Sequence, residues 1–182
     1  MADPERTGVT VDAALRDLHE RTDRRFEETS ARLPARIGCG PGCSACCVDG
    51  LTVFEPEAER IRSWVQETGA SVQVGSQGAC AFLDGAGRCQ VHPARPYVCR
   101  SQGAVLRWFE PEERRATCDQ HLHGVELSGL AEAALFDLGP AESDLVVLAT
   151  RRLQERGGRG LPGRRALREL AQELAADATG RP

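Results

Sequence analysis

Eight cysteines lie between residues 39 and 118, and the rest of the chain contains none. Four of them fall between residues 39 and 47, and the full set is Cys39, Cys43, Cys46, Cys47, Cys80, Cys89, Cys99 and Cys118. Thiols at this density indicate a disulfide framework, a metal site or a redox site. Each of these ties distant parts of the chain together through sulfur, so this segment constrains the fold more than any other feature.

The compartment decides between disulfides and metal. The first residues are polar and acidic, and no apolar run follows that could form the core of a signal peptide. The apolar stretch 145–149 is far too short to span a bilayer. We therefore expect a cytoplasmic protein with no membrane partner. Thiols stay reduced in that compartment, which favours metal binding over a disulfide scaffold.

The composition excludes several functions. Hydrophobic residues make up 41% of the chain but aromatic residues only 4%, so Leu, Val and Ala must build most of the core. A bound metal could add stability to such a core. The net charge of −4 argues against a nucleic-acid partner. All 23 basic residues are Arg, which excludes a lysine nucleophile or Schiff base.

The apolar spacing predicts a mainly α-helical fold with irregular metal-binding loops and at most short strands. Thr10 should cap a helix over 11–33 that ends near Pro34, and Gly69 should follow a helix over 56–68. The other expected elements are helices near 130–138, 141–156 and 164–177, strands at 51–54 and 72–74, and a hairpin from 104–109 to 114–118.

These elements predict one domain over residues 1–182 with a small cysteine-cluster core organised around metal. An N-terminal helix over 10–34 and a C-terminal helical extension over 127–178 flank the metal-binding core over 37–123.

The spacing of the first cysteines is typical of a metal site. Cys43 and Cys46 form a C-x-x-C pair whose thiolates can converge on one metal or cluster. Cys47 adds a third sulfur, and a disulfide between the neighbours Cys46 and Cys47 would be strained. Cys39 could reach the same centre through the Gly-Pro-Gly turn that follows it. The later cysteines are too far apart for local turns, so the fold must bring them back.

Four segments resemble the YkgJ-type cysteine-cluster family, which is described as a zinc- or iron-chelating domain. They are Cys43-Ser44-Ala45-Cys46-Cys47, Cys80-Ala81-Phe82-Leu83-Asp84, Gly87-Arg88-Cys89 and Arg95-Pro96-Tyr97-Val98-Cys99-Arg100. The chain departs from the family pattern at Ser44, Ala81 and His92, where the family has Gly, Pro and Tyr. Some relatives carry this domain within a flagellin lysine methylase, where it looks like an iron–sulfur domain.

The resemblance implies a set of metal ligands. The expected ligands are Cys43, Cys46, Cys47, Cys80, Cys89 and Cys99, with Cys39 and Cys118 as weaker candidates. The interval between Cys39 and Cys43 is one residue longer than the family pattern, which weakens the case for Cys39.

Two arginines could stabilise the charge of such a centre. Four thiolates around a divalent ion, or around a 4Fe–4S core, leave about two negative charges. Guanidinium groups supply hydrogen-bond donors to such an anion. We expect this role for Arg95 and Arg100, while pairing with surface carboxylates is the alternative.

The histidines are weaker candidates. His92 lies in the cysteine segment, but a packing role is favoured because it replaces a Tyr of the family pattern. His121 and His123 follow Cys118 and could form a second site with it, although a solvated loop is the preferred interpretation. His19 is expected on the surface of the first helix.

The metal and the function stay open at this point. A 4Fe–4S cluster is slightly favoured because adjacent cysteines are unusual in simple zinc ribbons. Zinc comes next, and iron is possible. Eight cysteines could also hold one centre of each kind.

The chain is expected to be a metal-binding protein with an accessory or redox-related role, and it could also bind a protein partner. One alternative is an enzyme whose iron or iron–sulfur site assists modification, such as methylation or oxidation, of a protein or small molecule, although no glycine-rich loop for a nucleotide-like cofactor is visible. Another is a structural zinc protein or a thiol oxidoreductase, the latter disfavoured because no βαβ pattern surrounds Cys43 and Cys46.

Overall fold

A computed structural model describes residues 9–35, 37–40, 42–120, 122 and 124–179. This part of the chain forms five α-helices and five short strands. The helices are α1 (Val11–Ser30), α2 (Glu55–Thr68), α3 (Tyr97–Arg100), α4 (Gly139–Glu155) and α5 (Leu167–Thr179). The strands are β1 (Thr52–Phe54), β2 (Val105–Phe109), β3 (Glu113–Ala116), β4 (Leu135–Asp137) and β5 (Arg164–Ala166). The predicted helical character with short strands is confirmed.

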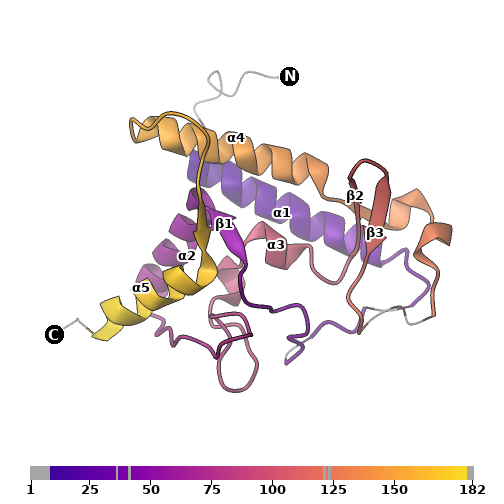
Figure 1. Cartoon of the computed structure of the whole chain (residues 1–182), viewed down its shortest axis with the longest axis horizontal. Helices are drawn as coiled ribbons and strands as arrows, with labels where there is room; N and C mark the ends of the chain where they lie inside the picture. The colour runs from indigo at the N-terminus through magenta and orange to yellow at the C-terminus, as the bar shows by residue number, and fades with distance from the viewer. Residues whose placement is uncertain (1–8, 36, 41, 121, 123, 180–182) are drawn as a thin grey trace.

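The two longest helices, α1 and α4, lie side by side along one edge of the molecule (Figure 1). Thr10 caps α1 as predicted, because its hydroxyl accepts a hydrogen bond from the Ala13 N–H at 3.2 Å. Leu15 and Leu18 on α1 belong to one hydrophobic cluster with Leu145 and Leu148 on α4. The apolar face of α1 therefore fixes α4, although more than 100 residues separate them.

A second hydrophobic cluster joins α2, α5 and the loops that carry the cysteines. Ile61 on α2 and Leu170 on α5 are fully buried there, together with Phe82 from the loop between Cys80 and Cys89. The strand β5, just before α5, pairs with β1 in an antiparallel register in which Thr52 lies opposite Ala166. The C-terminal helix is thus packed directly against the cysteine-bearing segment.

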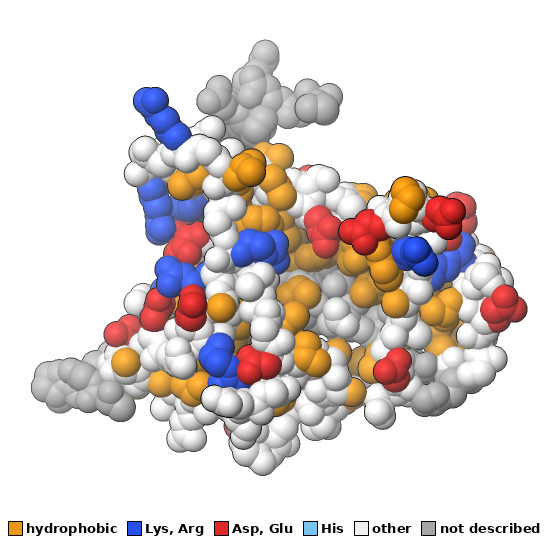
Figure 2. Space-filling view, viewed as in Figure 1, with side chains coloured by type: hydrophobic (Ala, Val, Ile, Leu, Met, Phe, Trp, Pro, Cys, Tyr) orange, Lys and Arg blue, Asp and Glu red, His pale blue; other side chains and the backbone are white. Residues whose placement is uncertain are grey.

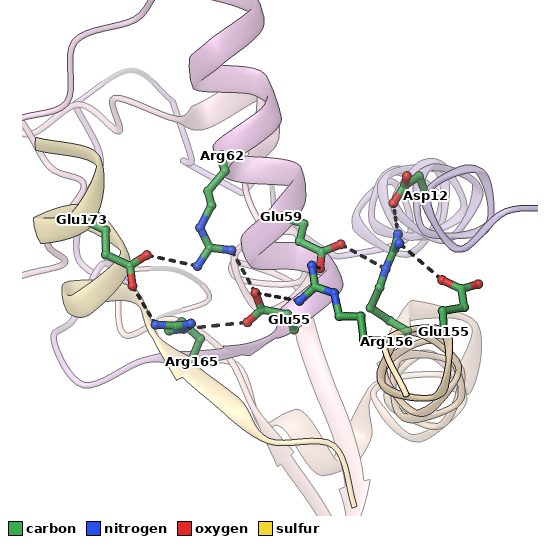
Figure 3. A network of polar contacts seen from close by, with 9 residues as sticks. Asp12, Glu55, Glu59, Arg62, Glu155, Arg156, Arg165 and Glu173 are labelled. Carbon is green, nitrogen blue, oxygen red and sulfur yellow. Dashed lines mark hydrogen bonds and ion pairs between the residues drawn. The ribbon is translucent and has the colours of Figure 1, made fainter. Parts of the chain in front are cut away.

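Ion pairs also connect the helices (Figure 3). Arg62 on α2 bridges Glu55 at 3.0 Å and Glu173 on α5 at 3.1 Å. Arg152 on α4 pairs with Glu59 of α2 at 3.0 Å and also contacts Asp12 of α1. The network therefore links α1, α2, α4 and α5 through charge as well as through apolar packing.

A small three-stranded sheet replaces one predicted helix. The hairpin β2–β3 is confirmed, with Leu106 opposite Ala116. Residues 130–138, predicted as a helix, instead form a 3-10 turn (Glu132–Ala134) and β4, which pairs in parallel with β2. Leu135 and Phe136 are buried in this strand, so tertiary pairing overrides the helical propensity of the sequence.

Two further predictions are wrong in instructive ways. Residues 72–74 form no strand, because the Gln73 N–H donates to the side chain of Gln90 rather than to a neighbouring strand. His19, expected on the surface, is only 5% exposed, and its Nε2 lies 3.6 Å from Glu57 Oε1.

No helix in the described ranges combines the length and apolar character needed to cross a membrane.

Candidate metal centre

Cys80 is brought back to the first cysteine loop by backbone pairing. The Cys80 N–H donates to the Cys47 carbonyl at 2.9 Å, and Val48 forms a β-bridge with Ala79. The two cysteines are 33 positions apart in the sequence but lie on adjacent stretches of backbone. The return of the chain that the family resemblance required is therefore made by main-chain hydrogen bonds.

A tight loop returns Cys89 towards Cys80. Leu83 forms a β-bridge with Cys89, and the Gln90 N–H donates to the Phe82 carbonyl at 2.9 Å. The carboxylate of Asp84 closes the turn by accepting from the Arg88 N–H at 2.8 Å. This loop holds Cys80 and Cys89 close together without a regular helix or strand.

Cys99 reaches the same region from the short helix α3. Its N–H donates to the Pro96 carbonyl at 2.9 Å. The buried carboxylate of Glu57 on α2 accepts from the Tyr97 N–H at 2.7 Å. Glu57 therefore fixes α3 to α2, and with it the position of Cys99.

Cys39 is packed against a glycine at the far end of α3. The Sγ of Cys39 lies 2.7 Å from the point where a Cβ on Gly103 would stand, and Gly103 has a φ of +95°. Only glycine tolerates both this backbone conformation and this close approach. The Cys43 N–H donates to the Gly40 carbonyl at 3.0 Å.

The thiols influence one another electrostatically. Burial, with the nearby thiols of Cys80, Cys89 and Cys46, raises the pKa of Cys99 to about 12. A hydrogen bond from the Cys47 thiol lowers the pKa of Cys46 to about 6, and the same bond raises the pKa of Cys47. The thiols involved in these shifts come from the first cysteine loop, from the Cys80–Cys89 loop and from α3.

The thiols are gathered but not arranged around an ion. In the described ranges, no group of three or more His, Cys, Asp or Glu side chains has the geometry to hold a metal. All eight cysteines are thiols rather than disulfides, and their exposure varies from the buried Cys80 to the exposed Cys43. A set of soft, neighbouring sulfur donors fits zinc or iron, and side-chain rotation would be needed to complete the coordination.

The two arginines expected near the centre have carboxylate and carbonyl partners. The guanidinium of Arg100 donates to Asp23 on α1 at 2.5 Å, to the Arg95 carbonyl at 2.8 Å and to the Pro93 carbonyl at 3.2 Å. Arg95 pairs with the same Asp23 at 3.3 Å. Arg100 is only 9% exposed and adjoins Cys99, so a role beside the thiolates stays a prediction, while its observed contacts join α3 to α1.

Arg168 on α5 holds both cysteine loops, and sequence analysis did not identify it. Its Nε lies 2.9 Å from each carboxylate oxygen of Asp49, two residues after Cys47. Its other nitrogens donate to the carbonyls of Gly75, Ser76 and Ala79, just before Cys80. No local pattern marks this residue, because all its partners are about 90 or more positions away.

The histidine predictions have mixed outcomes. The ring of His92 is exposed and faces the guanidinium of Arg95, with Nε2 3.0 Å from Nη1. Partial desolvation against the neighbouring residues, and then the positive charge of Arg95, lower the pKa of His92. His121 and His123 lie outside the described residues.

An apolar groove adjoins the cysteine region on the other side of α3. It has a volume of about 260 Å³ and is lined by Thr52, Phe54, Glu57, Tyr97, Val98, Ser101, Gln102, Leu106, Leu138, Glu142, Leu145, Val146 and Arg164. Figure 2 shows hydrophobic side chains gathered in the middle of this face. Arg164 lies over the ring of Phe54, with its Cζ 4.5 Å from the ring centroid. Four of the lining residues are neighbours of Cys99 in sequence.

Comparison with known proteins finds a family model that covers the cysteine segment. The model of the family CxxCxxCC, described as a "putative zinc- or iron-chelating domain", matches residues 38–120. The match contains all eight cysteines and both loops held by Arg168. No curated protein and no solved structure matches the chain. The match supports the assignment of residues 38–120 to this cysteine-cluster family.

Proposed function

We propose that this chain is a metal-binding protein that holds an iron–sulfur cluster or zinc through its clustered cysteines. The candidate ligands are Cys43, Cys46, Cys47, Cys80, Cys89 and Cys99. The observation that carries the proposal is the backbone pairing of Cys47 with Cys80 and of Leu83 with Cys89, which brings separate cysteines into one region. Thiolates gathered in this way bind soft metal ions tightly.

The protein contributes the sulfur donors and the position of each donor. An iron–sulfur cluster would supply electron transfer or a binding site for substrate atoms, whereas zinc would supply rigidity. Glu57 fixes Cys99 through α3, and Arg168 fixes the loops before Cys80 and after Cys47. An accessory or redox-related role is consistent with an iron–sulfur cluster, which the adjacent cysteines slightly favour.

Metal analysis of protein purified without oxygen tests this proposal. We expect iron or zinc in near-stoichiometric amount, with visible absorption and acid-labile sulfide only if a cluster is bound. A matched variant in which Cys80 and Cys99 are both replaced by Ser should lose the bound metal. Its total helix content, measured by circular dichroism, should stay close to that of the wild type.

Folded, fully reduced wild-type protein that neither contains nor takes up zinc or iron would contradict the proposal. Metal that stays bound when Cys80 and Cys99 are both replaced would contradict their assignment as ligands.

The groove beside α3 supports a second candidate function for the chain. In this function, the metal centre assists the modification of a substrate that is bound in the groove. Tyr97, Val98 and Ser101 line the groove, while Cys99 on the same helix belongs to the cysteine region. A molecule in the groove would thus lie one helix away from the metal. Val146→Arg, at an exposed residue of the groove lining, would introduce charge there without opening the core, and we expect it to abolish substrate binding while leaving the metal content unchanged.

A further inference from the structure

The groove beside α3 leaves apolar surface open to water. Buried side chains such as Phe54 and Leu145 form part of its lining, and Val146 on α4 also lines it and is 42% exposed. A volume of about 260 Å³ has room for a branched apolar side chain, since one water molecule takes only about 30 Å³. Hydration of apolar surface is unfavourable, so the groove favours an apolar occupant.

The loop after α4 presents a large apolar side chain to solvent. Leu161 is 92% exposed, more than any other large apolar side chain in the described ranges. The start of this loop is held by hydrogen bonds, because the Gly157 N–H donates to the Gln154 carbonyl at 2.8 Å and the Gly158 N–H to the Leu153 carbonyl at 2.9 Å. The strand β5 holds its other end. A loop fixed at both ends displays Leu161 at a defined place on the surface.

Leu161 and the groove are neighbours on the same molecule. Arg164, three residues after Leu161, lines the groove and lies opposite Phe54 in the pairing of β5 with β1. Figure 1 shows the loop running from the end of α4 to β5, beside β1. Two complementary surfaces this close together can meet twice when a second copy is related by a two-fold axis. Each loop would then lie in the groove of the other copy.

Glu142 is the charge at the groove that lacks a partner. Glu57 accepts hydrogen bonds from two backbone N–H groups, and Arg164 donates to the hydroxyl and the carbonyl of Thr52. Glu142 is exposed on α4 and makes no ion pair among the described residues. An occupant with a positive charge beside its apolar side chain would therefore complement this groove.

The loop itself supplies that combination. Arg159 lies two residues before Leu161, is exposed and makes no ion pair within the described ranges. Phe109, at the tip of the β2–β3 hairpin, is also strongly exposed at 65%, but Glu110 and Glu112 follow it closely. These carboxylates would repel the carboxylate at the groove. The charges thus favour the loop after α4 over the hairpin as the occupant.

We propose that the groove beside α3 is a self-association site, which receives Leu161 from a second copy of this chain while Arg159 of the partner subunit pairs with Glu142. This inference goes beyond the proposed metal-binding function and does not depend on it, because no candidate metal ligand takes part. The dimer is weak and reversible, since each copy contributes only one loop and one groove. A substrate of the second candidate function would enter the groove of the monomer only.

Sedimentation equilibrium of the reduced full chain over a range of concentrations tests the contact. Wild-type protein should show a monomer–dimer equilibrium. Leu161→Asp and Val146→Arg should each raise the dissociation constant of the dimer by at least about tenfold, because each places a charge in the apolar contact. Val147→Arg is the matched control, since Val147 is 51% exposed on the same helix but does not line the groove, and it should leave the equilibrium unchanged.

Exchange of the two charges tests the orientation of the contact. Arg159→Glu and Glu142→Arg should each weaken the dimer, because each places two like charges together. The double variant restores an opposite pair and should recover most of the affinity. Raised salt should weaken the wild-type dimer. A double variant as weak as the two single variants would contradict the pairing of Arg159 with Glu142.

Several outcomes would overturn the self-association site. Wild-type protein that stays monomeric at its highest soluble concentration would do so. So would a dimer that Phe109→Ser dissociates and Leu161→Asp does not. A monomer that binds an apolar fluorescent dye, which Val146→Arg then excludes, would assign the groove to a small molecule instead.

These results stay separate from the proposed function because metal content is measured on the same samples. A dimer without bound zinc or iron would support the self-association site and contradict the metal site. A monomer with bound metal would do the reverse. Every substituted side chain is exposed, and circular dichroism checks that each variant is folded.

Discussion

The helical frame and the cysteine segment are stabilised by different means. The frame, formed by α1, α2, α4 and α5, has two buried apolar clusters and a network of Arg–carboxylate pairs (Figure 3). The cysteine loops between residues 38 and 100 contain little regular structure beyond β1, α2 and α3. They are held by main-chain bridges, by Arg168 and by a few side chains, such as Phe82, that pack in the second cluster. From this contrast we expect the frame to depend mainly on apolar burial, and the loops to gain their final order from the proposed metal.

Removing the metal should have the largest effect and should act on one region only. Apparent binding free energies of structural thiolate sites are about 10–16 kcal/mol, and this energy orders the loops that supply the ligands. After chelation, amide hydrogen exchange should accelerate strongly at residues 42–50 and 76–90 and change little in α1 and α4. Equal acceleration in both regions would break the comparison, because the frame would then depend on metal as well.

A cavity in the frame should have the opposite effect. Leu15 on α1 is almost fully buried, so Leu15→Ala should lower the free energy of unfolding by about 2–5 kcal/mol. The metal content per folded molecule should stay the same. Val147→Ala on the exposed face of α4, where Val147 is 51% exposed, serves as the control and should change stability by less than about 0.5 kcal/mol. Loss of metal from folded Leu15→Ala protein would show that the two regions are coupled.

Arg168 is the residue where the two regions meet. Arg168→Gln removes its charged contacts to Asp49 and to three carbonyls, and we expect metal retention against a chelator to fall by roughly 10–100-fold with helix content unchanged. Arg168→Lys should recover only part of this, since an ammonium lacks the planar fork of donors. Arg60→Gln on α2 is the control. Unchanged metal release in Arg168→Gln would mean that the loops hold their shape without the frame.

The ion-pair network of the frame should give the smallest effect. Arg62→Gln removes the bridge between Glu55 and Glu173, and partly exposed pairs of this kind contribute less than about 1 kcal/mol each. Thermal unfolding at low and high salt should show a difference from wild type that shrinks as salt rises. A large, salt-independent loss would mean that Arg62 acts through packing of its aliphatic stem.

The elements that the sequence predicts well are those set by local pattern. The apolar spacing and the Thr10 cap define α1, and Gly69 ends α2 in the left-handed conformation with a φ of +66°. The hairpin β2–β3 follows from turn residues and strand-forming side chains close together in the chain. In the site, the C-x-x-C-C pattern is local in the same sense, and it marked Cys43, Cys46 and Cys47 directly.

The features that the sequence could not predict depend on contacts between distant residues. The pairing of β4 with β2 turned an expected helix into a strand, and the pairing of β1 with β5 joins segments more than 100 positions apart. His19 is buried because Glu57 comes from another helix to meet it. The return of Cys80 and Cys89 to the first loop was accessible only through family resemblance, and nothing near Arg168 indicated its role.

The position of Arg168 also sets an order of events during protein synthesis. A ribosome adds about 5–20 residues per second, so roughly 3–10 s separate translation of Cys118 from that of Arg168. All eight thiols therefore exist on the nascent chain before β5 and α5, which complete the packing around Cys80, have been made. In that interval the thiols are open to oxidants and to whichever soft metal is most available. The proposed metal site would therefore gain its final packing around Cys80 only after α5 has been added.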